Sequence, residues 1–310
     1  MLSRWVVLLS LSFLLPTELC AGQAAGTQTA PFQYGVSVEL VDLFASVHDS
    51  RGRLVNKLNR NDFLIYDNGV IQPITEFSRE YSPLSVLILL DTSGSMAGAK
   101  IENARKSLVQ FLKHLNRGDE AMLITFRSKP RIIEGFTQDL AGIRRDLARA
   151  EGTGSTALYD AIIMALDQIG NAHNRRRALL LISDGINTYG KAQLKDSVET
   201  LRKRGVELFA IGIGSDLPED VRETEATKII LDRLTGSAGG ESFVVSDSKD
   251  LPRICEAISE QMHNQYTLGY APPTPRENGW RRIRVETRIP GLTVVASKTG
   301  YYPSTPRIPD

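Results

Sequence analysis

The sequence predicts an α/β protein whose doubly wound, mostly parallel sheet is inserted between N-terminal and C-terminal β segments. Short apolar runs alternate with amphipathic helical stretches over residues 82–265, as is typical of a parallel sheet covered by helices on both faces. The flanking residues 34–80 and 266–303 show strand-like alternation and turn residues instead. Each flank has too few strands for a core of its own, so we expect the two to pair into one small β-sandwich.

Apolar continuity and helical periodicity assign the elements of the central region. The continuous apolar run 84–90 predicts a strand buried on both faces, and further strands are expected at 121–126, 178–183, 206–213 and 242–245. Residues 131–136 follow a short turn, and we expect them to pair antiparallel with residues 121–126. The stretches that predict helices are 104–115, 140–150, 157–169, 192–204, 221–234 and 251–262.

Turn residues separate the strands expected in the flanks. Asp67, Asn68 and Gly69 follow the apolar stretch 63–66, and an Asn-Gly pair is typical of a hairpin turn, here returning through residues 70–74. The other strand-like segments are 34–47 in the N-terminal flank and 266–270, 280–287 and 292–297 in the C-terminal flank.

The charge balance excludes one broad class of partner. The 310 residues include 37 Lys and Arg and 36 Asp and Glu, so the net charge of +1 provides no field that would draw the protein to nucleic acid or to anionic lipid. The run of three arginines at 175–177 is expected in a solvated loop, and Arg281, Arg282 and Arg284 are expected to guard a strand edge. The four histidines lack metal-ligand spacing.

The first 25 residues have the pattern of an export signal. Arg4 precedes an apolar run over residues 5–15, and small residues at 21–25 offer a cleavage site, so we expect an exported protein that is periplasmic or extracellular. No later stretch is apolar enough to span a membrane, which predicts no transmembrane segment after cleavage. Lipidation at Cys20 is the alternative, and Cys255 is expected to be a buried, unreactive thiol.

The first buried strand ends in a group of oxygen-bearing side chains. Asp91, Ser93 and Ser95 precede a helix, and Gly94 allows the chain to bend sharply between them. Loops at the carboxyl ends of parallel strands form the ligand crevice of such sheets. Hard oxygen donors suit Mg²⁺, although the same residue types also serve as helix N-caps.

Two further polar positions follow other strands of the same sheet. Thr156 lies in a Gly- and Ser-rich loop ahead of the helix at 157–169, and Asp184 ends the strand at 178–183. Each alone is an ordinary loop or turn residue. Because both belong to loops on the carboxyl side of the sheet, we expect them to join the first group in one cation site.

These five positions resemble, one by one, the metal-ion-dependent adhesion site (MIDAS) of von Willebrand factor A (VWA) domains and integrin inserted domains. The order of strands and helices over residues 82–265 resembles the same Rossmann-like fold. The flanks resemble the secreted VWFA-related proteins of acidobacteria, through residues 61–63, 67–69, 266–270 and 300–302. The resemblance implies Mg²⁺, or Mn²⁺ or Ca²⁺, bound by Asp91, Ser93, Ser95, Thr156 and Asp184, with an Asp or Glu of a protein partner completing the shell.

The sequence therefore favours a secreted or envelope-associated binding protein over an enzyme. By analogy with integrins, movement of the last helix, residues 251–265, could couple the cation site to the conformational state of the domain. A structural VWA module without metal-dependent binding is one alternative. A Mg²⁺-dependent phosphatase-like hydrolase is another, but that chemistry needs an acid two residues after Asp91, where this chain has Ser93. No Gly-x-Ser-x-Gly elbow supports a serine hydrolase. The oligomeric state is left open.

Overall fold

The computed structural model describes residues 40–184, 187–214, 221–273 and 279–303. The expected signal at 1–25, Cys20 and residues 34–39 of the N-terminal flank lie outside this part of the chain. No helix in the described part combines the length and apolar character that crossing a membrane requires.

A six-stranded sheet forms the centre of the α/β region, with strand order β10-β9-β8-β5-β6-β7. Its strands are β5 (Leu84–Asp91), β6 (Glu120–Phe126), β7 (Pro130–Thr137), β8 (Arg176–Ser183), β9 (Glu207–Ile213) and β10 (Gly240–Val245). All neighbours are parallel except β6 and β7, which confirms the antiparallel pair expected from the short turn. The sheet is therefore mixed and mostly parallel, as predicted.

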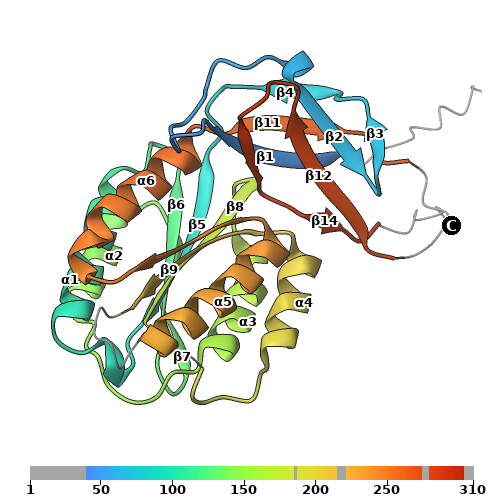
Figure 1. Cartoon of the computed structure of the whole chain (residues 1–310). Coiled ribbons are helices and arrows are strands. Elements are labelled where there is room, and N and C mark those ends of the chain that lie inside the picture. The colour runs from blue at the N-terminus through green and yellow to red at the C-terminus, as the bar shows by residue number, and fades with distance from the viewer. Residues whose placement is uncertain (1–39, 185–186, 215–220, 274–278, 304–310) are drawn as a thin grey trace, which may run out of the picture. The chain divides into compact units, whose positions relative to one another are not determined.

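Helices cover both faces of this sheet (Figure 1). Their bounds are α1 (Ala99–Lys113), α2 (Leu140–Leu147), α3 (Leu158–Gln168), α4 (Leu194–Arg204), α5 (Val221–Ala238) and α6 (Leu251–His263), with 3-10 turns at Arg60–Asp62, Gly94–Met96, Ile169–Asn171 and Ser248–Asp250. One apolar core joins α1, α2 and α6 to the sheet, and the other joins α3, α4 and α5 to the opposite face. Every residue of β5 and β9 is buried because both faces are covered, which explains their continuous apolar runs.

The flanking segments combine into two antiparallel sheets, with strand orders β13-β1-β11-β4 and β14-β12-β2-β3. Their strands are β1 (Val41–His48), β2 (Phe63–Asp67), β3 (Val70–Gln72), β4 (Glu76–Ser78), β11 (Tyr266–Tyr270), β12 (Arg281–Thr287), β13 (Thr293–Ala296) and β14 (Gly300–Tyr301). Each sheet mixes strands from both flanks, and one apolar core contains residues from β1, β2, β11 and β12. The α/β region is thus inserted between the two halves of a β-sandwich, as expected.

The hairpin between β2 and β3 forms where the Asn-Gly pair predicted it. Asn68 has φ 48° and Gly69 has φ 82°, so both central residues occupy the left-handed conformation that a tight hairpin turn requires. Asp67, the last residue of β2, is fully buried there. Arg281 donates from Nε to Asp67 Oδ1 at 2.7 Å, so this arginine neutralises a buried acid and the expectation that it guards an edge was wrong.

Of the arginine run at 175–177, only Arg175 lies exposed in a loop as expected, and the expectation was wrong for Arg176 and Arg177, which belong to β8. Arg176 opens β8 and is 3% exposed. Its guanidinium donates to the carbonyls of Ser82 and Met262 and to Gln265 Oε1, at 2.6 Å for the last. Hydrogen bonds to carbonyls and an amide make this burial possible, and they fix the C-terminal end of α6 to the start of β8.

Candidate metal site

The candidate site lies at the carboxyl end of β5, where the strand order of the sheet reverses. The next strand in sequence, β6, pairs with one side of β5, whereas the later strands β8, β9 and β10 extend from its other side. Ligands of open α/β sheets bind at such switch points. The chain leaves β5 at Asp91, makes the 3-10 turn Gly94–Met96 and enters α1 at Ala99.

Asp91 is fully buried and held by two hydrogen bonds. Its Oδ1 accepts from the backbone N–H of Ser93 at 2.8 Å, and its Oδ2 accepts from Ser183 Oγ at 2.5 Å. The first bond closes the turn that follows β5, and the second joins the ends of β5 and β8. Both fix the orientation of the carboxylate before any ligand arrives.

The two serines and Asp184 continue this group. Ser93 Oγ and Ser95 Oγ lie 3.0 Å apart, and Ser95 Oγ donates to Asp184 Oδ1 at 2.8 Å. Asp184 Oδ2 accepts from Lys100 Nζ at 2.5 Å in an ion pair. Four of the five predicted positions are therefore connected by direct hydrogen bonds, although Asp184 follows Ser95 by 89 residues.

Thr156, the fifth position, lies in a loop that is bonded to the turn after β5. Gly94 N–H donates to the carbonyl of Gly154 at 2.8 Å, and Thr153 N–H donates to the carbonyl of Thr92 at 2.9 Å. A Cβ on Gly152 would lie 2.6 Å from the backbone nitrogen of Ala97, so only glycine allows this approach. The structure thus brings the loop of Thr156 against the other four positions.

Burial disfavours the charged form of Asp91, and a cation at this site would offset that effect. Burial is the largest influence on Asp91 and raises the pKa of its carboxyl to about 6, against hydrogen bonds from Ser183 and Ser93 that lower it, and the nearby charge of Asp184 raises it further. A divalent ion beside Asp91 would favour the ionised form. Carboxylates and hydroxyls are hard oxygen donors, so this donor set fits Mg²⁺ and similar ions. The described residues contain no group of three His, Cys, Asp or Glu that could hold a metal, so the fit depends on the hydroxyls.

Sequence reasoning missed two members of this hydrogen-bonded group, Ser183 and Lys100. Ser183 is a polar residue at the end of an otherwise apolar strand, directly before Asp184. Lys100 is a cation in the first turn of α1, where the helix dipole disfavours positive charge. Both residue types are unfavourable at these positions. A polar or charged residue at an unfavourable position indicates that its side chain has a specific partner, so this feature could have pointed to both residues.

An exposed aromatic side chain stands on a fixed loop next to Thr156. Tyr189 is 53% exposed, and its backbone N–H donates to the Thr156 carbonyl at 3.0 Å. On its other side, the N–H groups of Lys191 and Ala192 donate to the carboxylate of Asp160. Because hydrogen bonds hold the backbone on both sides of Tyr189, its ring can contact a partner at small entropic cost.

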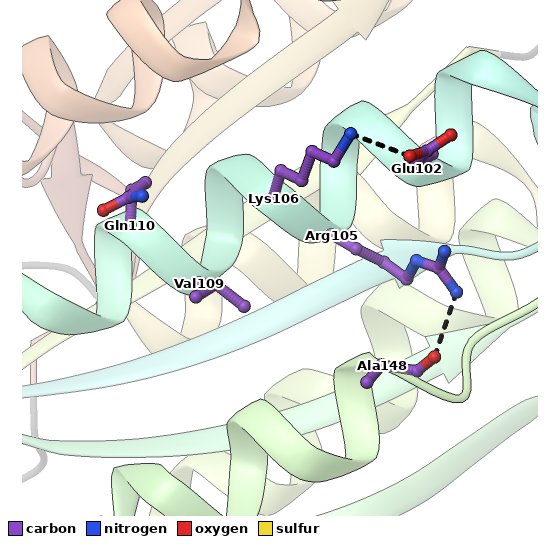
Figure 2. A pocket seen from close by; sticks show the side chains of 6 residues that line it. All are labelled: Glu102, Arg105, Lys106, Val109, Gln110 and Ala148. Atoms are coloured by element: carbon purple, nitrogen blue, oxygen red, sulfur yellow. Dashed lines mark hydrogen bonds and ion pairs between the residues drawn. The ribbon is translucent and has the colours of Figure 1, made fainter.

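A hollow between α1 and α2 has no connection to this chemistry (Figure 2). It measures about 290 Å³, and its lining contains none of the five metal candidates. Arg105 donates to the carbonyl of Ala148 at 3.0 Å, and Lys106 pairs with Glu102 at 2.7 Å, so both cations are already neutralised or bonded (Figure 2). The hollow therefore offers no free charge to a ligand.

The central region matches the sequence model of the von Willebrand factor type A domain over residues 85–257, which is more than half of the chain. The chain therefore belongs to the VWA family, and the resemblance stated from the sequence is confirmed. Human inter-alpha-trypsin inhibitor heavy chain H4 is 26% identical over 150 residues, and heavy chain H2 from Sus scrofa is 25% identical over 153. Each match covers 44% of this chain and only 16% of the relative's length.

Solved structures show the same fold. A von Willebrand factor type A protein from Catenulispora acidiphila superposes with a TM-score of 0.53 at 12% identity and covers 87% of this chain and 76% of its own. Proximal thread matrix protein 1 from the mussel byssus, with a zinc-occupied MIDAS motif, gives a TM-score of 0.51 at 18% identity and covers 63% of this chain and 49% of its own. At identities this low, the likeness shows a shared fold alone.

Proposed function

We propose that this chain is an exported, non-enzymatic binding protein that holds a divalent cation in its VWA domain and binds an acidic group of a protein partner through that ion. Asp91, Ser93, Ser95, Thr156 and Asp184 would hold the ion. Mg²⁺ is the first choice, with Mn²⁺ or Ca²⁺ as alternatives. The leader pattern at residues 1–25 supports export to the periplasm or the exterior.

The hydrogen bonds that join Asp91, Ser93, Ser95 and Asp184 are the observation that carries this proposal. These bonds bring oxygen atoms from the ends of β5 and β8 close together, and Asp91 and Asp184 are the two acidic residues among them. Three of the five ligands would be neutral hydroxyls, and the Asp184 carboxylate already pairs with Lys100, so the charge of a dication would be only partly compensated and one more carboxylate oxygen would bind well. The zinc-occupied MIDAS motif of the mussel protein, which shares the fold, supports a metal at the corresponding site.

The surroundings of the site suit an acidic partner. Arg127 is exposed and contacts the loop of Thr156, where its Nη1 donates to Thr153 Oγ1 at 2.6 Å and its carbonyl accepts from Ala157 N–H at 2.8 Å. Tyr189, whose backbone is bonded to Thr156, adds an exposed aromatic side chain. Aromatic and arginine side chains of this kind supply much of the binding energy at protein interfaces.

One observation favours a structural role as the second candidate. The four connected residues already form hydrogen bonds with one another, with Ser183 and with Lys100, so the loops could be fixed without an ion. The two functions differ in their response to a chelator. A structural module would hold its partner equally well with Mg²⁺ or with EDTA.

The test is calorimetric titration of Mg²⁺ into the mature protein and into Asp91→Ala, Ser93→Ala and Thr156→Ala. We expect Asp91→Ala to abolish binding because it removes a charge, whereas each hydroxyl loss weakens binding because water can refill the position. Asp167→Ala, which removes a half-exposed carboxylate on α3, is the matched control and should bind normally. Affinity capture from the envelope fraction with Mg²⁺ or EDTA then identifies partners lost with both EDTA and Asp91→Ala. Normal Mg²⁺ binding by Asp91→Ala would exclude the proposal.

A further inference from the structure

Lys100 lies near the N-terminal end of a helix, where a positive charge is unfavourable. It is the second residue of α1, and the N-terminal end of a helix carries partial positive charge that repels a cation. The side chain is not left to solvent, because its Nζ lies 2.5 Å from Asp184 Oδ2. This ion pair joins residues 84 positions apart and connects the helix after β5 to the end of β8.

The pair leaves Asp184 fully engaged. Its Oδ2 accepts from Lys100, its Oδ1 accepts from Ser95 Oγ at 2.8 Å, and its side chain is 1% exposed. The Lys100 side chain remains 33% exposed, so it reaches the buried carboxylate from the solvent side. Asp91, in contrast, accepts its hydrogen bonds from a backbone N–H and a hydroxyl, neither of which carries charge.

We propose that Lys100 sets the net charge of the cation site and thereby makes it select an anionic partner group. This inference rests on the proposed function above. Without Lys100, the carboxylates of Asp91 and Asp184 would balance the charge of a dication bound at this site, and the net charge would not favour an acid over a neutral ligand. Lys100 neutralises Asp184, so the loaded site retains one positive charge that favours a carboxylate. The same charge lowers the affinity for the cation itself.

A merely structural Lys100 would behave differently. If it only fastened the start of α1 to the end of β8, its loss would loosen the site and weaken both the cation and the acidic ligand. A charge-setting Lys100 moves the two affinities in opposite directions when it is replaced. That opposition is the readout that separates the two roles.

The experiment measures both affinities at low ionic strength in the wild type and four variants. Lys100→Met removes the charge and keeps most of the chain length, Lys100→Gln is a second variant in case Met perturbs folding, and Lys100→Arg retains the charge. Lys106→Met is the matched control, because Lys106 lies on the same helix but pairs with Glu102 away from the site (Figure 2). Electron paramagnetic resonance titration gives the Kd for Mn²⁺, and fluorescence anisotropy of labelled hexaglutamate at saturating Mn²⁺ gives the Kd for the acid. Hexaglutamine is the neutral comparison.

We expect Lys100→Met and Lys100→Gln to bind Mn²⁺ about tenfold more tightly and hexaglutamate about tenfold more weakly than the wild type, as one unscreened charge at short range allows. Lys100→Arg and Lys106→Met should stay within about twofold of the wild type for both ligands. Hexaglutamine should bind none of the proteins measurably.

The outcomes separate this inference from the proposed function. If the wild type binds no Mn²⁺, the proposed function is overturned and the role of Lys100 with it. If the wild type binds Mn²⁺ but not hexaglutamate, the selection of an anionic group is overturned. If it binds both ligands and the two Lys100 variants weaken both or change neither, Lys100 does not set the charge and the proposed function stands.

Discussion

Tyr270 donates a hydrogen bond from its hydroxyl to Asp67 Oδ2 at 2.9 Å, and this bond joins the two sheets of the β-sandwich through a buried carboxylate. Tyr301 donates to the same oxygen at 2.8 Å, and Arg281 holds Oδ1 at 2.7 Å. Strands from both flanks of the α/β region thus meet at one acid. Residues 67–69, 266–270 and 300–302, which are far apart in sequence, are brought together at this acid.

Replacing Asp67 by Ala should destabilise the protein strongly, because Arg281 and two tyrosine hydroxyls lose their acceptor while they stay buried or half-buried. We expect a loss of about 3–5 kcal/mol in the free energy of unfolding, measured by urea denaturation. Glu286→Ala is the control, since Glu286 pairs with Arg284 on the surface and its loss should cost less than about 1 kcal/mol. Equal effects of the two substitutions would contradict a structural role for the Asp67 cluster.

Glu207 should make stability depend on pH. Burial raises its pKa to about 7, against the attraction of Arg176 and a hydrogen bond from Gln265 that lower it. Between the ordinary value of 4.5 and about 7 the native state binds more protons than the unfolded state, so this group's contribution is fully present below pH 4.5 and is lost as pH rises through 7. The change amounts to at most about 3 kcal/mol.

Glu207→Gln removes this titration. The stability of the variant relative to the wild type should therefore increase between pH 5 and pH 8, as measured by urea denaturation at several pH values. The exposed Glu199, which pairs with Lys203, provides the control Glu199→Gln, and its relative stability should be flat over that window. A flat difference for Glu207→Gln would show that the acid ionises normally in the folded protein.

Gly152→Ala should disturb the candidate metal site while the core survives. The new Cβ would lie 2.6 Å from Ala97 N and 2.9 Å from the carbonyl oxygen of Ser93, so the two loops must separate. We expect at least about tenfold weaker Mg²⁺ binding by calorimetry, because ligands must be held within about 0.5 Å of their productive positions. Gly170→Ala has open space around its Cβ and serves as the control. Unchanged Mg²⁺ affinity in Gly152→Ala would show that the close approach of the loops is not needed.

A chain truncated after Gln265 tests the proposed domain boundaries at 34–80, 82–265 and 266–303. β1 would lose its partners β11 and β13, and β2 would lose β12. We expect limited proteolysis to remove the N-terminal flank and leave a resistant fragment near residues 82–265, because the latter retains its sheet and both helical layers. Cleavage throughout the α/β region would show that it depends on the sandwich.

The secondary structure of the α/β region could be predicted because its signals are local. The strands, the helices and the antiparallel β7 all follow from apolar runs and periodicity, and α1 alone begins several residues earlier than predicted, at Ala99. The three-residue β4 and the two-residue β14 were not predicted, since such short strands form through pairing with neighbours. Their sequences carry no pattern of their own.

The contacts of single polar residues were harder to predict, because they depend on pairs far apart in sequence. Ser183 meets Asp91 across 92 residues, and no spacing rule relates them. Arg176 looked like part of a charged loop, yet it is buried and donates to the carbonyl of Met262 at the end of α6. His263 likewise pairs with Asp119 at 3.0 Å, a contact that its isolated position gave no reason to expect.

The chain enters and leaves the α/β region through two strands that are bonded to each other. Ser78, at the end of β4, lies opposite Thr267, near the start of β11, and only β11 borders β4 in its sheet. Mechanical tension from a partner held at the α/β region would pull these two strands from the same end and in the same direction. The pair would move together, and the force would act lengthwise on the ladder between β11 and β1. Under a force parallel to the strands, all hydrogen bonds of this ladder bear the load together, whereas a force perpendicular to the strands would break them one after another.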